Sequence, residues 1–384
     1  MDVTATPAKK QRLFFIDMYR GLAVLVMIEG HVTNSTILDS IQKTKGFHYL
    51  DLLNGMPAPS FIFMAGFAFT LGLGRKWDDL MTGGKLLWSQ IRRLLFVIAV
   101  GYWLHIPIWS FRGMLKMSHE SWVYFLRADV LQTIGISLLI ALITAVVVRN
   151  KKILMMLLAI LALAVIFVTP FLQDMDPLQY FPASLGAYLN YHNGSLFPLF
   201  PWSAYVFLGA LFCYWYLTVK GTPREPLFFG LLFASGLLMF VLGRVLFYAP
   251  WSYYDHYADP ARSSPRFFMF RLGFVFMVLS ALWLYERKRK PERSILSITG
   301  QESLFIYGFH LLIVYGSVMI PYSIATNVGK TLTYLPSLLL SVLVISTSIV
   351  CGLFWHKMKE DRPILAKRVF YALCAIYFFR FFLF

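Results

Sequence analysis

The stretch RLFFIDMYRGLAVLVMIEGH, residues 12–31, decides the fold because it is a long apolar run that also contains ionisable side chains. A helix that crosses a membrane needs about 20 mostly apolar residues, and this run has that length. Asp17, Arg20, Glu29 and His31 lie within it or at its edge. Ionisable groups at membrane depth are costly, so they usually face a cavity or a polar path rather than lipid. The stretch therefore predicts a membrane helix that carries function.

The rest of the chain continues the apolar pattern. Its 384 residues are 58% hydrophobic and 14% charged, whereas about 25% are charged in a typical soluble domain. Backbone polar groups must be satisfied inside the bilayer, so the apolar runs are predicted to be helices. We predict an all-α, polytopic membrane bundle of about 11 transmembrane helices. It forms a single domain over 13–384 after a tail at 1–12. The predicted spans are 14–33, 57–74, 91–110, 129–148, 153–171, 197–218, 226–247, 267–286, 302–320, 335–356 and 369–384.

The basic residues indicate which side of the membrane each connection faces. They gather in alternate connections, as they do in the cytoplasmic loops of membrane proteins, so the N-terminus is predicted to be cytoplasmic. The connection at 172–196 has no Lys or Arg and is predicted on the other side. This spread also argues against nucleic-acid binding, despite the formal net charge of +16. The residues that define the basic side are Lys9, Lys10, Arg12, Arg75, Lys76, Lys85, Arg92, Arg93, Arg149, Lys151, Lys152, Lys220, Arg224, Arg287, Lys288, Arg289, Lys290, Arg293, Lys357, Lys359, Arg362, Lys367 and Arg368.

The first predicted helix places three ionisable residues on one face. Arg20 and His31 are 11 residues apart, which corresponds to about three helical turns and roughly 16 Å of rise. Asp17 lies about one turn before Arg20 on the same face, whereas Glu29 points to the opposite side. The face thus combines an acid–base pair near the cytoplasmic end with an imidazole near the outer end. The alternative interpretation is that Asp17 and Arg20 only anchor the helix at the interface.

Two further histidines are candidates for catalysis. His48 lies in the predicted connection GFHYLDLLNGMPAPS at 46–60, which also holds Asn54. The Pro- and Gly-broken helix that follows is typical of backbone that lines a cavity. His310 lies in the middle of a predicted span, and Tyr307 is available as a partner one turn earlier. A plain surface histidine and a packing histidine are the respective alternatives.

Gln132, in ADVLQTIGISLL, and Arg244, in VLGRVLF, are further polar residues inside predicted spans. Arg244 lies in the outer half of its helix, where it would bind an anionic or carbonyl group of a ligand or reach back to the interface. The chain has no P-loop, no HExxH motif, no serine nucleophile elbow and no CxxC pair. ATP-driven transport and zinc proteolysis are therefore not expected, and we predict no metal site.

Five stretches, taken in order, resemble the transmembrane acyltransferases related to heparan-α-glucosaminide N-acetyltransferase. The first is the opening helix, in which a basic residue and an Asp precede an Arg-Gly pair and an apolar run. The order and the spacing of the five carry the resemblance, which covers nearly the whole chain. The stretches are 12–31, APSFIFMAG at 58–66, ADVLQTIGISLL at 128–139, FPLFPWSAYVFLGA at 197–210 and GQESLFIYGFHLL at 300–312.

The resemblance implies an 11-helix bundle that takes an acyl group, usually acetyl, from cytoplasmic acyl-CoA. The acceptor would be a sugar amine or hydroxyl on the far side of the membrane. In the mammalian enzyme the key histidine follows the Arg-Gly helix, and His48 is its positional equivalent here. Many bacterial relatives instead end that helix with an Asp-His pair, which reads Glu29-Gly30-His31 in this chain. Either His31 or His48 is therefore the main catalytic group.

The chemistry of such a transfer assigns roles to these residues. A thioester is already activated, so the protein must deprotonate the acceptor and stabilise an oxyanion. A histidine suits the base, and it can alternatively be acylated itself. Arg20, Asn54 or Gln132 would stabilise the negative charge, with Arg244 and His310 as further candidates for donor binding. Asp17 and Arg20 would organise the donor entrance, where Lys and Arg attract the phosphates of acetyl-CoA.

Two other functions compete with this prediction. A proton-coupled transporter of a small solute would use Asp17, Arg20 and Glu29 as a relay, but no internal repeat supports it. A non-enzymatic scaffold would need the same residues only for stability. We expect a multi-pass protein of the bacterial cytoplasmic (inner) membrane whose partners are acyl-CoA, a sugar or glycan acceptor and lipids. A homodimer is compatible with this pattern.

Overall fold

The computed structural model describes residues 12–74, 76–247, 260–289, 293–318 and 320–383. In these residues the chain is helical apart from connections and isolated bridges, as the all-α prediction requires. The tail predicted at 1–12 lies outside them except for its last residue. The longer helices are α1 (Phe14–Thr36), α4 (Pro57–Gly74), α6 (Lys85–Leu104), α9 (Val130–Val148), α10 (Lys151–Gln173), α12 (Leu199–Val219), α13 (Glu225–Phe247), α15 (Pro265–Arg289), α17 (Ser303–Val314), α19 (Tyr334–Asp361) and α20 (Pro363–Leu383).

Shorter helices lie mainly in the connections. The predicted connection at 46–60 is itself largely helical, because Thr44 accepts a hydrogen bond from the Phe47 amide and caps α3. The shorter helices are α2 (Asp39–Gln42), α3 (Lys45–Asn54), α5 (Trp77–Met81), α7 (Phe111–Leu115), α8 (His119–Phe125), η1 (Pro177–Gln179), α11 (Ala183–Gly186), α14 (Pro260–Ser263), α16 (Ile295–Gln301) and α18 (Ile324–Asn327).

Seven helical stretches of the described residues are long and apolar enough to cross a membrane. They correspond to the predicted spans that begin at 57, 129, 153, 197, 226, 267 and 335. The predicted spans 14–33, 91–110 and 369–384 form α1, α6 and α20, which have 23, 20 and 21 residues but carry several charged side chains. The predicted span 302–320 holds α17, which has only 12 residues. The count of eleven spans therefore remains a prediction.

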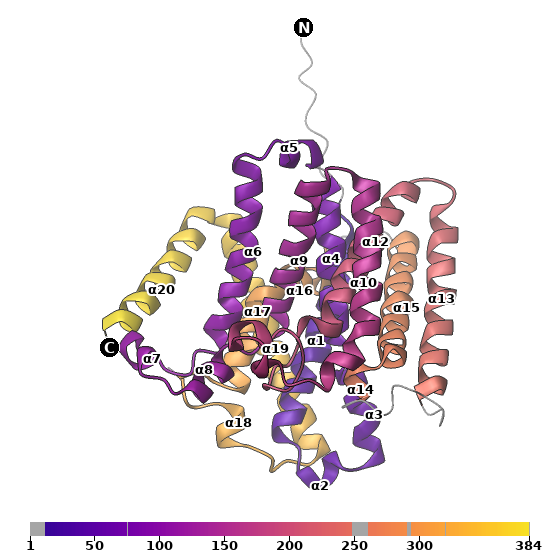
Figure 1. Cartoon of the computed structure of the whole chain (residues 1–384). Helices are drawn as coiled ribbons and strands as arrows, with labels where there is room; N and C mark the ends of the chain where they lie inside the picture. Colours follow the sequence, from indigo (N-terminus) through magenta and orange to yellow (C-terminus); the bar gives the residue numbers. More distant parts are fainter. Residues whose placement is uncertain (1–11, 75, 248–259, 290–292, 319, 384) are drawn as a thin grey trace.

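The long helices run side by side as a bundle with two distinct ends (Figure 1). One end carries α5 and the connection between α12 and α13, and the opposite end carries α2 and α3 (Figure 1). Both connections at the first end hold lysines that define the predicted basic side. We call this end the basic end and the other the distal end.

Glycines let the central helices approach closely. A Cβ on Gly66 of α4 would lie 1.9 Å from the Val206 carbonyl oxygen of α12, and one on Gly209 would lie 2.0 Å from the Phe63 oxygen. In a membrane such close backbone packing replaces the hydrophobic driving force between helices. The small residue Gly21, which belongs to the decisive first helix, meets the backbone of α16 in the same way.

Aromatic rings fill the core near the start of α1. Phe15 is 1% exposed, and its ring makes edge contacts with Phe67, Tyr216 and Phe229 at centroid distances of 6.4, 6.0 and 5.9 Å. Edge-to-face pairs of this kind add about 0.5–1.5 kcal/mol each to the burial of the rings. The first turn of α1 is therefore held firmly among α4, α12 and α13.

Candidate active site

Two histidines from distant parts of the chain meet inside the bundle. His31 Nδ1 and His310 Nε2 are 2.9 Å apart, and the two rings are stacked with centroids 5.2 Å apart and planes 11° from parallel. His310, on α17, is fully buried, whereas His31, near the end of α1, keeps part of its surface exposed. The structure thus joins two of the histidines that the sequence singled out separately.

The hydrogen bonds of the pair define where the protons lie. His310 Nδ1 lies 2.9 Å from the Ile306 carbonyl oxygen, which only accepts, so His310 donates from Nδ1. Neither ring contacts a carboxylate among the described residues, and an unpaired buried charge is costly, so we treat both rings as neutral. His310 Nε2 must then accept from His31 Nδ1–H. The Nε2 atom of His31 is left with a free lone pair and is able to act as a base.

The two helices that carry the pair, α1 and α17, share a buried apolar cluster with α19. Val24 of α1, Ile306 of α17 and Val344 of α19 belong to one buried cluster. The ring of Tyr315 lies edge-on to His31 at a centroid distance of 5.7 Å. His310 itself is fully buried, and a low local dielectric strengthens its hydrogen bond with His31.

A buried carboxylate, Asp129, lies close enough to the histidine pair to interact electrostatically with His31. Its Oδ1 accepts a hydrogen bond of 2.7 Å from the Val130 amide at the start of α9, and its Oδ2 lies 3.2 Å from His105 Nε2. The Tyr307 hydroxyl donates to Oδ2 over 3.5 Å, and the Tyr307 ring makes an edge contact with His310 at 5.8 Å. Helices α6, α9 and α17 thereby contribute polar groups next to the histidine pair.

Sequence reasoning missed Asp129 and His105 as members of this site. Asp129 could have been identified from its position in ADVLQTIGISLL, directly before an apolar run. A carboxylate at such a position commonly caps the helix that follows. Gln132, which was predicted, is fully buried one turn later, and neither its Oε1 nor its Nε2 has a partner among the described residues. A buried amide without partners is costly, so it is free to bind a polar group of a ligand.

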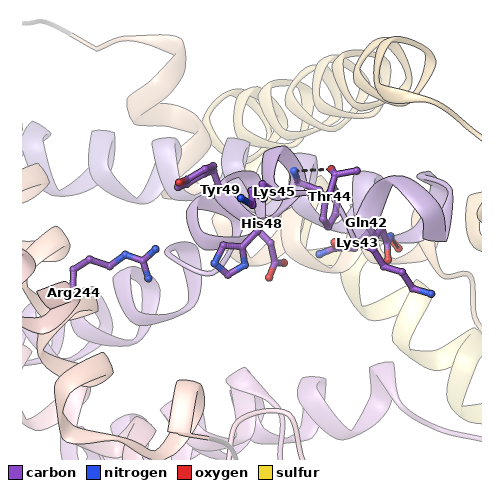
Figure 2. A pocket seen from close by; sticks show the side chains of 10 residues that line it. Gln42, Lys43, Thr44, Lys45, His48, Tyr49 and Arg244 are labelled. Carbon is purple, nitrogen blue, oxygen red and sulfur yellow. Dashed lines mark hydrogen bonds between the residues drawn. The ribbon is translucent and has the colours of Figure 1, made fainter. Parts of the chain in front are cut away.

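His48 and Arg244 line one cavity at the distal end, with a volume of about 580 Å³. Figure 2 shows the Arg244 side chain reaching toward His48 from a different helix. His48 itself is exposed. The cavity is large enough for a small polar ligand such as a sugar. Its lining residues are Asn34, Gln42, Lys43, Thr44, Lys45, Phe47, His48, Tyr49, Asp51 and Arg244.

This distal cavity begins one helical turn beyond His31, because Asn34 of α1 lines it. Asn54 connects the two regions, since its side chain packs on Gly30, where an added Cβ would lie 3.0 Å from Asn54 Cβ. Asn54 also donates a long hydrogen bond of 3.5 Å to Thr33. The structure therefore separates the two histidines that the resemblance left as alternatives: His31 is partnered inside the bundle, and His48 is exposed at the cavity beyond it.

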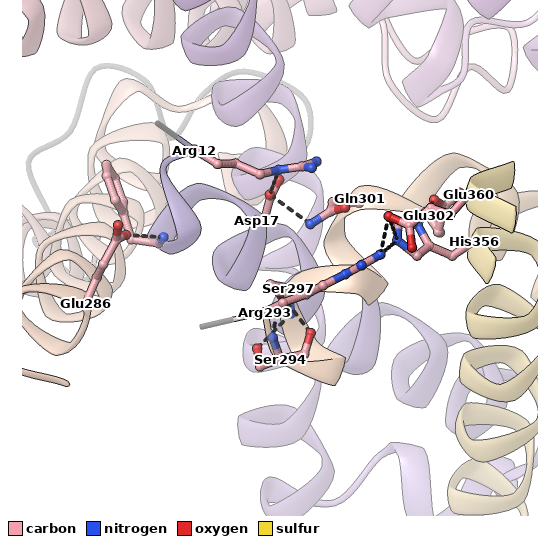
Figure 3. Close-up of polar contacts among 11 residues, drawn as sticks. Arg12, Asp17, Glu286, Arg293, Ser294, Ser297, Gln301, Glu302, His356 and Glu360 are labelled. Carbon is pink, nitrogen blue, oxygen red and sulfur yellow. Dashed lines mark hydrogen bonds and ion pairs between the residues drawn. The ribbon is translucent and has the colours of Figure 1, made fainter. Parts of the chain in front are cut away.

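Asp17 and Arg20 interact electrostatically, but each forms its direct polar contacts with other residues. The Asp17 carboxylate pairs instead with Arg12 over 2.8 Å and accepts from Gln301 over 3.2 Å (Figure 3). Arg20 Nη2 donates to Ser303 Oγ over 2.6 Å. Both side chains thus tie α1 to the segment 301–303 rather than to each other, because α16 packs directly on this face of α1.

A second polar cluster lies beside this contact. Glu302 is 4% exposed and accepts a hydrogen bond of 2.6 Å from His356 of α19 (Figure 3). It also accepts one of 2.6 Å from Lys359 of the same helix. Arg293 pairs with Glu360 over 2.7 Å. These ion pairs connect α16, α17 and α19 at one place, and they fix the helix that presents His310 to His31.

The fold and this site define an all-helical membrane protein with a buried histidine pair. The sequence profile described as heparan-alpha-glucosaminide N-acetyltransferase, catalytic, matches residues 12–247. Because this match covers more than half of the chain, the protein belongs to that family of membrane acetyltransferases. Among proteins with curated descriptions, none matches this sequence. The matched residues include His31, His48, Asp129 and Gln132, whereas His310 lies beyond them.

Proposed function

We propose that this protein transfers an acetyl group from acyl-CoA at the basic end to a sugar amine or hydroxyl at the distal end. The observation that supports this most directly is the His31–His310 pair, in a chain that belongs to a membrane acetyltransferase family. Family membership favours this function over the transporter and scaffold alternatives. The basic end would face the cytoplasm, in line with the distribution of Lys and Arg, and a bacterial cytoplasmic membrane is the proposed location.

His31 would act as the general base in a direct transfer. Its Nε2 takes the proton from the acceptor N–H or O–H while the acceptor atom attacks the thioester carbon. A C–N or C–O bond forms and the C–S bond breaks. The coenzyme A thiolate leaves and takes up the proton from His31. His310 holds His31 in the tautomer that has Nε2 free, so it would position the base without touching the substrate.

The remaining candidate residues would bind the two substrates. The unpartnered amide of Gln132 would donate to the oxyanion, because such a group needs no rearrangement before the reaction. His48, Asn54 and Arg244 would hold the acceptor at the distal cavity. Asp17 and Arg20 would keep α1 and the segment after α16 in register at the donor end. No metal takes part in this proposal.

The test is acetyl transfer in inverted membrane vesicles supplied with radiolabelled acetyl-CoA. We expect label on a glycan inside the vesicles, and we expect His31→Ala to lower the rate by about 10²–10⁴, the usual contribution of a general base. His48→Ala should instead raise the KM for the acceptor. His119→Ala is the matched control, because His119 is exposed on α8, far from both regions in sequence. Full activity of the His31→Ala and His48→Ala double variant would remove histidine from the mechanism.

A further inference from the structure

A second cavity, of about 340 Å³, lies at the basic end of the bundle between α4, α5, α10 and α12. It has no lining residue in common with the distal cavity or with the histidine pair. We call it the basic groove. The residues that line it are Thr70, Leu71, Leu73, Gly74, Trp77, Lys151, Met155, Tyr214, Leu217, Thr218 and Lys220.

Two lysines converge on the basic groove from different helices. Lys151 is the first residue of α10, and Lys220 directly follows α12. The Lys151 ammonium lies 5.3 Å from the centre of the Trp77 ring, which holds it over the groove. None of the lining residues is acidic, and Glu286, which interacts electrostatically with Lys220, is not among them. The groove therefore suits an anionic group.

Thr70 adds an unpartnered hydroxyl to the residues that line the basic groove. The residue is 4% exposed, and its hydroxyl is buried without a partner among the described residues. Thr169 of α10 donates back to the carbonyl four residues earlier, and Thr218 of α12 donates to the carbonyl three residues earlier. A hydroxyl without such a bond needs another acceptor. A phosphate oxygen in the groove would supply one once the buried Thr70 side chain rotates toward it.

The remaining walls of the groove are apolar. Leu73, Met155 and Leu217 come from three helices that are each apolar and long enough to cross a membrane. Leu217 is 37% exposed on the outer surface of the bundle. A ligand that fits this combination has a phosphate at the lysines and an apolar chain that continues along the helices. Bilayer phospholipids have that chemistry, and they reach this position without leaving the membrane.

We propose that the basic groove binds the headgroup of one anionic phospholipid, with its phosphate between Lys151 and Lys220 and in contact with the Thr70 hydroxyl. The other source of such a phosphate is coenzyme A, which would arrive from water rather than from the bilayer. The experiment below separates the two. It measures lipid binding and not acetyl transfer, so its result does not depend on the function proposed above.

The full-length protein is purified from nanodiscs that contain equal amounts of phosphatidylglycerol and phosphatidylcholine, and retained lipid is counted by native mass spectrometry. We expect one phosphatidylglycerol per chain in the wild type. Lys151→Gln combined with Lys220→Gln should weaken retention by about thirtyfold, since each lysine near an anionic lipid contributes about a fivefold factor. Thr70→Val, which is isosteric, should weaken it severalfold.

Lys152→Gln is the matched control, because Lys152 is the exposed neighbour of Lys151 on α10 and does not line the groove. It should retain phosphatidylglycerol as the wild type does. The proposal is wrong if the double variant also retains the lipid, or if phosphatidylcholine is retained equally well. It is also wrong if saturating free coenzyme A displaces the lipid, because the groove would then belong to the nucleotide.

Discussion

His31 and His310 are 279 positions apart in the sequence and in contact in the structure. The sequence predicts the importance of each histidine but not their contact. Each histidine was predictable alone, because an imidazole inside an apolar run needs a partner. Their pairing was not, because it depends on how α17 packs against α1. The tautomer of His31 depends in turn on the Ile306 carbonyl, a backbone group that no sequence motif reveals.

We predict that His310→Ala lowers the rate of acetyl transfer by about 10–100-fold, the usual effect of losing a residue that orients a functional histidine. Without an acceptor at Nδ1, His31 spends time in the tautomer whose Nε2 carries the proton. His310→Gln places an amide oxygen near the position of Nε2 and should recover part of the rate. The KM for acetyl-CoA should stay unchanged in both variants. Equal rates for the Ala and Gln variants would contradict a positioning role.

Two substitutions of Asp129 distinguish the effect of its negative charge on the reaction from its role as the cap of α9. Its carboxylate interacts electrostatically with His31, so it would stabilise the imidazolium that forms when His31 takes a proton. Asp129→Asn keeps an oxygen for the Val130 amide but loses the charge, and we expect a rate about tenfold lower, which corresponds to about 1.4 kcal/mol. Thermal unfolding in detergent should change little for Asn, whereas Asp129→Ala should also lose about 1 kcal/mol of stability with the cap. An unchanged rate in the Asn variant would exclude this electrostatic role.

At the scale of helices, close contacts between α1 and α16 supply the direct hydrogen-bond partners of Asp17 and Arg20. Gly21 and Gly30 of α1 admit close neighbours, which are Leu296 of α16 and Asn54 of α3. The short α16 was not predicted, because its polar sequence ILSITGQ gives no membrane signal. Because α16 packs on α1, Asp17 and Arg20 each hydrogen-bond to a residue of the segment 301–303.

Gly300 tests this contact between helices. An added Cβ there would lie 1.8 Å from the Asp17 carbonyl oxygen, so Gly300→Ala must push α16 away from α1. We expect a loss of about 1–3 kcal/mol of stability, typical of overpacking, seen as a lower unfolding temperature in detergent. Gly308→Ala on α17 is the matched control, because nothing lies within 4 Å of its added Cβ. That variant should be neutral or slightly more stable, since Ala favours a helix. Equal unfolding temperatures would mean that α16 does not need this close approach.

At the scale of the whole molecule, the length of the apolar runs predicted the helices of the bundle well. Runs such as 129–148 and 153–171 are helices with nearly those bounds, α9 and α10, because no charged residue interrupts either run after its first position. The span expected at 302–320 is shorter, because Gly316 adopts a positive φ of 72° just after α17 ends and the chain turns there. Hydrophobicity therefore predicts where the chain is helical, whereas backbone turns decide how far each helix extends.

The two ends of the bundle give the last prediction, which concerns sidedness. Lys43 lines the distal cavity and Asp79 lies on α5 at the basic end, and both residues are exposed (Figure 1). Cys213, Cys351 and Cys374 are first replaced by Ser, and a single Cys is then introduced at position 43 or 79. If the basic end is cytoplasmic, a membrane-impermeant maleimide should label Lys43→Cys in intact bacterial cells and Asp79→Cys only after permeabilisation. The reverse pattern would place the histidine pair nearer the cytoplasm and would require the acceptor, rather than the donor, to come from inside the cell.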